Sequence, residues 1–429
     1  MLTMILTIAS HTFREAIRKK TLHILIGLGI LIVLVSPLFP TTDEPNARIK
    51  MMLVAFFQVT VLLSIMGIIF ISATSIPLEI EDKTIYGVLS KPISRLKVVV
   101  GKITGFALLS AFLLLILSLL NFVAIQWIAS RLPAEYKGIL KARKEFKAPQ
   151  FCIQGKSHHT SGGIIWVEGG RKGVALWSFS DLDKKSDGNY PYEVEFNLKI
   201  ESSKEFIDTI PLVVGIENPV LGLHKTEVLS SKMDQPLTLK IDHEIVQKSN
   251  NINITVFPLL ETDYIGITPE TIKMFSIEKG FLLNYAKAIV IIFLKFLLIT
   301  IIAVMCSTYL SAPLSIVSTF VVFLCGHILD FVKDFSLLLQ RYDAHEHTFP
   351  ILIKKPNIFF AYLDYLIKKP LEWFSFVLPD FKKFDSLKFL LKGIHIPLEA
   401  IGFSLGYTVM YAAICLFISS VIFNKREFF

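Results

Sequence analysis

Charged residues are scarce in this chain, and cysteines are scarcer still. Asp, Glu, Lys and Arg make up 19% of the 429 residues, whereas hydrophobic residues make up 53%. Soluble domains carry about 25% charged residues, so this composition excludes an ordinary soluble protein and indicates a polytopic membrane protein. Of the four cysteines, only Cys152 stands outside the apolar stretches, which excludes a disulfide-stapled domain. Any domain outside the membrane must therefore be stabilised by a packed core.

The sequence also lacks a nucleotide-binding motif. Gly155-Lys156-Ser157 resembles the end of a phosphate-binding loop, but the motif needs a glycine five residues before Gly155, and Gln150 stands there. Gly101-Lys102 fails as well, because Ile103 follows it. We therefore expect that the chain is not an enzyme and that any ATP-driven work needs a partner subunit.

No group of residues has the spacing of a metal or catalytic site. Two groups hold metal-ligating residue types without a recognised spacing: Cys152, His158 and His159, and Asp343, His345 and His347. The run from Asp181 to Gly188 begins like a calcium loop, but Lys185 occupies a ligand position. Solvated loops and turns are the preferred interpretation, so we expect no metal, no cofactor and no catalytic residue.

Apolar runs of about 20 residues, long enough to cross a bilayer core, recur along the chain. We expect six spans: His23 to Leu38, Met52 to Ser75, Thr104 to Ala129, Phe281 to Cys306, Leu314 to Val332 and Leu398 to Phe423. A cleaved signal peptide is an alternative interpretation of the first span, because Arg18-Lys19-Lys20 precedes it. No small-residue cleavage site follows Pro37 and Pro40, which disfavours that alternative.

Lysines and arginines near span ends are retained in the cytoplasm and so predict orientation. With six spans, the basic residues of the amino terminus, of the loop 79–102 and of the carboxyl tail fall on one side. We therefore expect a multi-pass protein of the inner membrane with both termini in the cytoplasm. The lysine-rich residues 333–392 would lie outside, where the rule has little authority over so long a loop. The net charge of +8 favours attraction to anionic membrane lipid rather than nucleic-acid binding.

Two regions differ in pattern from the spans. Residues 6–20 have an apolar and a basic face, typical of a helix in the inner membrane interface, although a helix running directly into the first span is an alternative. Tyr192 to Ile200 and Ile252 to Val256 alternate apolar and polar residues, as half-buried strands do, and turn signals such as Gly169-Gly170 separate further strands. Ala134 to Lys147 is expected to be a charged helix extending from the third span.

The expected fold is an α-helical polytopic membrane protein with six transmembrane helices and an inserted, mainly-β extracytoplasmic domain. Its parts are residues 1–129 (amphipathic helix, spans one to three and the loop 77–102), 130–280 (β-rich domain), 281–332 (spans four and five), 333–397 (extracytoplasmic amphipathic helices) and 398–429 (span six and cytoplasmic tail).

A short charged stretch, Leu78 to Arg95, lies between the second and third spans. Its apolar residues follow helical spacing, which predicts one short helix from Leu78 to Leu89 with the acidic residues on its other faces. Lys91-Pro92 is expected to end that helix, because proline disfavours helix in the residue before it. A stiff charged segment between two membrane helices is suited to receive force from a soluble partner.

Lys295 stands midway along the fourth span, where an unpaired ammonium group is costly. Such a residue faces a cavity or a partner, and a polar contact on a substrate path is the functional interpretation. Snorkelling, or a structural pair with a neighbouring polar group, is the alternative.

Four stretches together resemble permease subunits of the ATP-binding-cassette superfamily, of the type-two (type V exporter) class. They are Thr12 to Lys20, similar to the family's connecting helix; Glu79 to Arg95 with Val100-Gly101-Lys102, similar to its coupling loop; Ser307 to Pro313, similar to the turn between spans four and five; and Phe423 to Glu427, similar to its basic ending. Each motif is weak alone, whereas their order is more specific. The resemblance covers the membrane portion, somewhat over half of the chain.

The resemblance implies an export permease driven by a separate cytoplasmic ATPase, with a second permease subunit completing a homodimer or heterodimer. By position, the ATPase contact would be Glu79, Glu81, Asp82, Lys83, Thr84 and Tyr86. The inserted domain and the long loop before span six depart from the family pattern and are expected to concern the substrate or an extracytoplasmic protein. Two alternatives stay open: an ATPase-driven complex that transmits force to an extracytoplasmic protein or lipoprotein, and a membrane-anchored sensor or scaffold without an ATPase.

Overall fold

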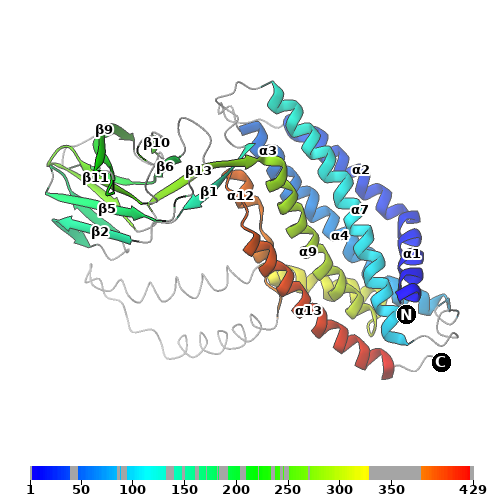
Figure 1. Ribbon diagram of the computed structural model, residues 1–429. Helices are drawn as coiled ribbons and strands as arrows, with labels where there is room; N and C mark the ends of the chain where they lie inside the picture. The colour runs from blue at the N-terminus through cyan, green and yellow to red at the C-terminus, as the bar shows by residue number, and fades with distance from the viewer. Residues whose placement is uncertain are drawn as a thin grey trace, which may run out of the picture. The chain divides into compact units, whose positions relative to one another are not determined.

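The computed structural model separates the chain into two compact units (Figure 1), which we call the helical unit and the β unit. The helical unit comprises Met1–Ile139, Leu282–Lys392 and Ile396–Phe429, and the β unit comprises Leu140–Phe281 and Gly393–His395. The residues that the structure describes are 2–38, 47–84, 87, 94–131, 140–146, 150–159, 164–170, 172–180, 182, 192–202, 209–220, 222–232, 237–241, 245, 251–268, 271–327 and 378–425.

The helical unit is built from long apolar helices and a few short ones. The described elements are α1 (Leu2–Arg18), α2 (Lys20–Val35), η1 (Ser36–Leu38), α3 (Ala47–Val54), η2 (Ala55–Thr60), α4 (Val61–Ala73), α5 (Ser75–Glu81), α7 (Arg95–Ser130), α9 (Phe281–Ser307), η4 (Phe381–Phe384), α12 (Leu387–Leu391) and α13 (Leu398–Lys425). A further apolar helix covers Ala312–His327.

Five stretches of helix in the described part of the chain are long and apolar enough to cross a membrane. They are Lys20–Leu38, Arg48–Glu81, Arg95–Ser130, Phe281–Ser307 and Leu398–Phe423. Each contains one of the predicted spans, which is consistent with a membrane protein. The run predicted as the fifth span forms the shorter Ala312–His327 helix, and its predicted end at Val332 lies outside the described residues.

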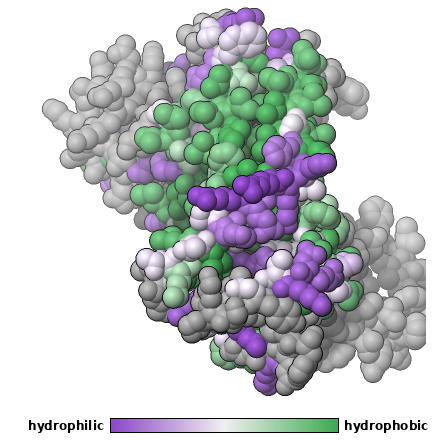
Figure 2. All heavy atoms as spheres, turned by 90° about the vertical axis from the view of Figure 1, so that its right-hand side faces the viewer, coloured by the Kyte–Doolittle hydropathy of each residue, from purple (hydrophilic) through white to green (hydrophobic). Residues whose placement is uncertain are grey.

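Apolar side chains stay exposed along several of these helices. Examples are Ile24 and Leu31 of α2, Leu115 of α7 and Phe417 of α13, each more than half exposed. Figure 2 shows one face of the molecule, where hydrophobic side chains gather in the upper part and hydrophilic ones across the middle and below. Such a distribution fits a surface that meets hydrocarbon in one zone and water in another.

The amphipathic helix predicted near the amino terminus is confirmed as α1. Ala9, Thr12 and Ala16 are buried, whereas Arg14 and Arg18 are exposed on the opposite side. Lys19 has extended backbone and separates α1 from α2, so α1 does not run uninterrupted into the first span.

Two glycines of α7 let α1 approach closely. A Cβ at Gly101 would lie 2.7 Å from the Ile8 side chain, and one at Gly105 would lie 2.8 Å from the carbonyl oxygen of Ala9. Small residues four apart allow two helix backbones to pack closely. The first turns of α7 are therefore shaped to receive α1.

In its described residues the β unit has thirteen strands, which pair antiparallel with one another. They are β1 (Lys141–Phe146), β2 (Gln150–Gly155), β3 (Ser157–His159), β4 (Ile165–Glu168), β5 (Gly173–Phe179), β6 (Tyr192–Phe196), β7 (Lys199–Ser202), β8 (Thr209–Asn218), β9 (Leu223–Lys232), β10 (Leu237–Ile241), β11 (Ile252–Pro258), β12 (Asp263–Ile267) and β13 (Ile272–Gly280). The described strands form three sheets, in the orders β1-β13-β6-β10, β2-β5-β11-β8-β9 and β3-β4-β12-β7.

One hydrophobic core joins the three sheets. Trp177, Phe179, Tyr192 and Phe196 are completely or almost completely buried in it. Buried and partly exposed residues alternate along β5, β6 and β11, as the period-two pattern predicted. At the turn before β5, Lys172 pairs with Glu261 at 2.8 Å, and this hydrogen bond raises the pKa of Lys172 and lowers that of Glu261.

Two expectations about this region are wrong. Lys141–Phe146 is strand β1 rather than part of a helix from Ala134 to Lys147, because Ala142 and Phe146 enter the core. Arg143 pairs with Glu193 of β6, and Glu145 pairs with Lys273 of the neighbouring β13. The single strand predicted from Tyr192 to Ile200 is two strands, β6 and β7, which belong to different sheets. Between them, Asn197 N–H donates to the carbonyl of Thr271.

We expect Gly105→Ala to destabilise the protein by about 1–3 kcal/mol, because the added methyl group forces α1 away from α7. Gly406→Ala in α13 is the matched control: its Cβ meets nothing within 4 Å, so the better helix propensity of alanine should stabilise by up to about 1 kcal/mol. Thermal unfolding in detergent measures both. Equal shifts for the two variants would contradict the close packing of α1 on α7.

Candidate functional site

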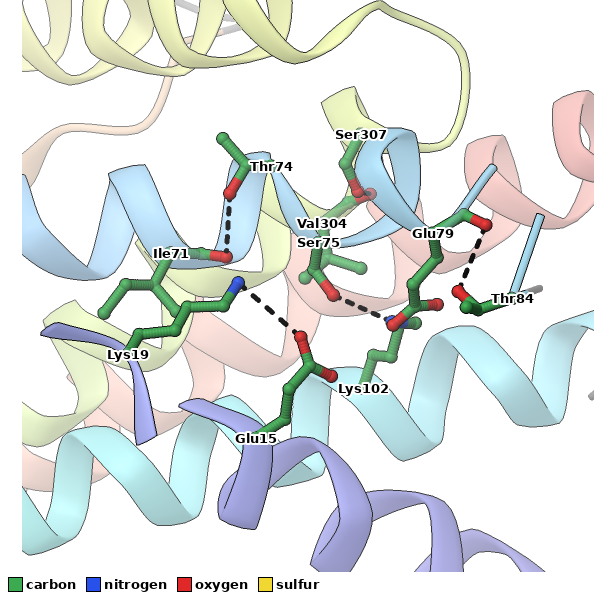
Figure 3. A network of polar contacts seen from close by, with 10 residues as sticks. All are labelled: Glu15, Lys19, Ile71, Thr74, Ser75, Glu79, Thr84, Lys102, Val304 and Ser307. Carbon is green, nitrogen blue, oxygen red and sulfur yellow. Dashed lines mark hydrogen bonds and ion pairs between the residues drawn. The ribbon is translucent and has the colours of Figure 1, made fainter. Parts of the chain in front are cut away.

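A buried lysine joins the two helices that flank the charged loop. Lys102 of α7 is only 3% exposed. Its Nζ donates to Ser75 Oγ at 2.8 Å and to the Glu79 carboxylate, both on α5 (Figure 3). These contacts fix α5 to the start of α7, so the two ends of the loop between these helices are held in place relative to each other.

Local hydrogen bonds shape the approach to this cluster. Thr74 forms the turn between α4 and α5, and its Oγ1 donates to the carbonyl oxygens of Phe70 and Ile71. Such bonds to the preceding turn commonly bend a helix. Ser75 then starts α5 in a buried position, where its hydroxyl meets Lys102.

The loop after α5 begins with an exposed turn. Glu81, Asp82, Lys83 and Thr84 are all exposed. Lys83 has a positive φ of 58°, a conformation that ends a right-handed helix. The Thr84 hydroxyl donates to the carbonyl of Glu79 at 3.3 Å, which closes the turn.

The helix predicted from Leu78 to Leu89 is therefore interrupted. The helical part stops at Glu81, because left-handed backbone at Lys83 cannot continue it. Tyr86 and most of the remaining loop lie outside the described residues. Of the six predicted contact residues, Glu79 turns inward to Lys102, and Glu81, Asp82, Lys83 and Thr84 stay at the surface.

The same end of the helical unit holds the end of α13. Arg95, the first residue of α7, donates to the carbonyl of Phe423 and lies over its ring at 5.8 Å. Basic residues lie at this end: Arg95, Lys97 and Lys102 near the start of α7 and Lys425 near the end of α13. The α1–α2 junction lies further along α7, because Ile8 faces Gly101 and Phe13 contacts Phe112. Acidic residues at this end are concentrated on and after α5.

Sequence patterns did not reveal the role of Lys102 and Ser75. Lys102 was counted only as a basic residue of the loop that predicts orientation. A signal existed, since a lysine inside the apolar first turns of a long helix needs a partner. Its partner residue, 23 positions earlier in the chain, becomes identifiable only when α5 and α7 are packed together.

Lys295, the second predicted site residue, has a polar partner inside the helical unit. Its Nζ lies 3.1 Å from His327 Nε2, and His327 Nδ1 lies 3.1 Å from the carbonyl oxygen of Phe323. Sequence reasoning missed His327, because nothing in the spacing links it to a residue 32 positions earlier. Lys287, the other lysine of α9, contacts a backbone group instead of a side chain: its Nζ donates to the carbonyl of Ile396 at 3.0 Å.

The residue groups considered as metal ligands do not form a site within the described residues. Cys152 is exposed on β2, and His158 and His159 belong to β3. Asp343, His345 and His347 lie outside the described residues, as does almost all of the run from Asp181 to Gly188.

No family model and no curated protein matches the chain. Similar solved structures include the CBM22-1-GH10 modules of a Clostridium thermocellum endo-1,4-beta-D-xylanase, with 11% identity and a TM-score of 0.21 over 33% of this chain and 29% of that chain. TmCBM61 in complex with beta-1,4-galactotriose has 13% identity and a TM-score of 0.18 over 30% of this chain and 90% of that chain. An arabinose-bound alpha-L-arabinofuranosidase has 9% identity and a TM-score of 0.18 over 36% and 27%. These scores are too low to carry an argument about function.

Substituting the two partners of the Lys102–Glu79 ion pair should lower the stability of the protein by unequal amounts. Glu79→Gln removes the counter-charge of a buried ammonium group and leaves it only neutral acceptors, so we expect a loss of about 2–4 kcal/mol in unfolding free energy. Lys102→Met should cost less, because Glu79 is 20% exposed and can still reach water. The double variant should recover part of the loss of Glu79→Gln.

Thermal unfolding of the four proteins in a double-mutant cycle measures this coupling. Glu81→Gln, an exposed position on the same helix, is the matched control and should change little. Additive effects of the two substitutions would show that Lys102 and Glu79 do not depend on each other.

Proposed function

We propose that this chain is the membrane-spanning subunit of an ATP-binding-cassette transporter of the exporter class, without catalytic activity of its own. A separate cytoplasmic ATPase would dock on the loop between α5 and α7. A second permease subunit, a copy of this chain or a related one, would complete the transporter.

The observation that carries the proposal is the attachment of the acidic turn. Glu81, Asp82, Lys83 and Thr84 are exposed, and the α5 turn just before them is tied to α7 through Glu79 and Lys102. A flexible loop would absorb a push from a soluble partner, whereas a turn fixed to two membrane helices passes movement to both. This arrangement supports energy coupling at this loop.

Charge supports the cytoplasmic placement of the same end. Arg95, Lys97 and Lys102 near the start of α7 and Lys425 near the end of α13 lie at the end of the helical unit that carries the acidic turn. Basic residues at span ends stay in the cytoplasm. Both chain termini and the ATPase contact would then share the cytoplasmic side of the inner membrane, and the inserted β unit would be extracytoplasmic.

The exposed apolar faces fit the other proposed partners. Phe403, Val409 and Phe417 of α13 and Leu28 and Leu34 of α2 are exposed. In a membrane, such faces meet lipid or a second permease subunit.

A force-transmitting complex is the second candidate. It is favoured by the direct joining of β13 and α9, since β13 ends at Gly280 and α9 begins at Phe281 with no linker residue between them. In that candidate, the ATPase moves the helices and the β unit acts on an extracytoplasmic protein. ATPase turnover stimulated by such a protein, rather than by lipid or a small molecule, would favour it over export.

The loop assignment predicts the effect of charge reversal. We expect a cytoplasmic ATPase to co-purify in stoichiometric amount with the detergent-solubilised chain from its native host. Glu81→Lys combined with Asp82→Lys should lower that yield about tenfold or more, because charge reversal at an interface places like charges together. Glu79 is left unchanged because its loss would also damage the contact with Lys102.

Glu201→Lys with Glu217→Lys makes the same charge change on exposed positions of the β unit and should leave the yield as in the wild type. Quantitative mass spectrometry compares the three preparations. An undiminished yield from the loop variant would remove the loop as the docking site. A reproducible lack of any ATPase would favour the sensor or scaffold alternative.

A further inference from the structure

A cavity of about 470 Å³ lies within the helical unit, around Lys295. Its walls come from η2 and α4, from α9, from the Ala312–His327 helix and from the segment that holds η4 and α12. Ligand pockets commonly measure about 300–1,000 Å³. The cavity is therefore large enough for the headgroup region of a lipid.

The segment with η4 and α12, residues 378–392, is held firmly in place, and we call it the capping segment. At Gly326, a Cβ would lie 2.3 Å from the carbonyl oxygen of Pro379, so the two backbones touch. The backbone N–H of Asp380 donates to Tyr407 OH of α13, and Ser386 Oγ donates to Ala288 O of α9. Three helices thus fix one wall of the cavity.

The charges lining this cavity are mainly positive. Among the described residues, Lys295, Lys382 and Lys388 line it, together with one carboxylate, that of Asp385. Asp385 already pairs with Lys388 at 3.5 Å. An anion is the complement that this lining calls for.

Lys295 lies beside a histidine ring nitrogen that can accept a hydrogen bond from it. The Phe323 carbonyl can only accept, so His327 Nδ1 carries the ring proton and Nε2 accepts from the Lys295 ammonium group. Within the described residues no carboxylate lies within ion-pair distance of Lys295, although the negative charge of Asp385 in the same cavity acts on it, and the amino group has further N–H groups to donate. His327 is fixed by stacking on Phe381, with ring centroids 5.6 Å apart.

The rest of the lining is apolar and reaches the surface. Phe57, Val61, Ile65 and Ile292 are among its hydrophobic residues. Leu62 of α4, also in the lining, is 49% exposed, and Gln58 is exposed beside it. The cavity thus reaches the surface along a face of a helix that is apolar enough to span a membrane, and also beside the exposed Lys382 and Lys388 of the capping segment.

The π-helix η2 contributes to this opening. π-Helical turns are rare in proteins overall, and those that occur are often found at functional sites. Each contains an extra residue, which widens one turn of the helix. Phe57 and Gln58 belong to η2 and line the cavity. Lys295 lies near the middle of α9, about 20 Å from either end at 1.5 Å per residue.

We propose that this cavity binds an amphiphile with an anionic headgroup, entering sideways from the membrane past Gln58 and Leu62. Lys295 and Lys382 hold the anion, and the apolar wall of α4 takes the start of the acyl chains. An acidic phospholipid is the simplest ligand of this chemistry. The proposal does not rest on the ATPase, because it concerns binding to this chain alone.

Native mass spectrometry of the delipidated, detergent-purified full chain tests the site, with phosphatidylglycerol and phosphatidylcholine of matched acyl chains as probes. We expect phosphatidylglycerol to bind about tenfold more tightly, as one charge-assisted contact provides. Lys295→Met should abolish the preference. Lys287→Met, which removes a lysine from the same helix outside the cavity, should retain it.

Three results would overturn the proposal: equal binding of the two lipids, an undiminished preference in Lys295→Met, or inorganic phosphate that binds as tightly as phosphatidylglycerol. The last would indicate a site for a soluble anion. If Lys295→Met does not fold, Leu62→Trp decides instead, because it obstructs the opening and keeps all lysines. That variant should weaken phosphatidylglycerol binding about tenfold, and unchanged binding would refute entry at this position.

Discussion

The burial of Lys102 determines how this end of the molecule is built. An ammonium group that is 3% exposed needs partners, and it finds them in Ser75 and Glu79 of the neighbouring helix. This requirement fixes α5 against α7, and α1 completes the packing where Gly101 and Gly105 leave room. The exposed turn at Glu81 and Asp82 is thereby presented from a rigid base rather than from a free loop.

Sequence periodicity predicted the elements whose structure depends on local pattern. The spans at Phe281–Cys306 and Leu398–Phe423 agree with α9 and α13 almost to the residue, because long apolar runs leave a chain in a membrane little choice but helix. The amphipathic α1 and the strand β11 were predicted for the same reason, since each buries one face at its own period.

Elements that depend on distant partners were not predictable from pattern. β1 is rich in charge and could have been helix, but pairing with β13 made it a strand. The helix after Leu78 ends early because Lys83 turns into the left-handed region, which no proline or glycine at that point announces. The pairs of Lys102 with Glu79 and of Lys295 with His327 join residues 23 and 32 positions apart, and only the packed helices bring them together.

The long segment of the β unit, Leu140–Phe281, begins and ends near residues that are paired with each other. Lys141 at the start of β1 is the partner of Gly280 at the end of β13. A domain with adjacent ends can be inserted into a host protein with little disturbance to the elements on either side. Apart from the short Gly393–His395 segment that pairs with β1, the β unit therefore has the architecture of a module, one that could have been gained, exchanged or lost as a piece during evolution while the helices around it kept their order.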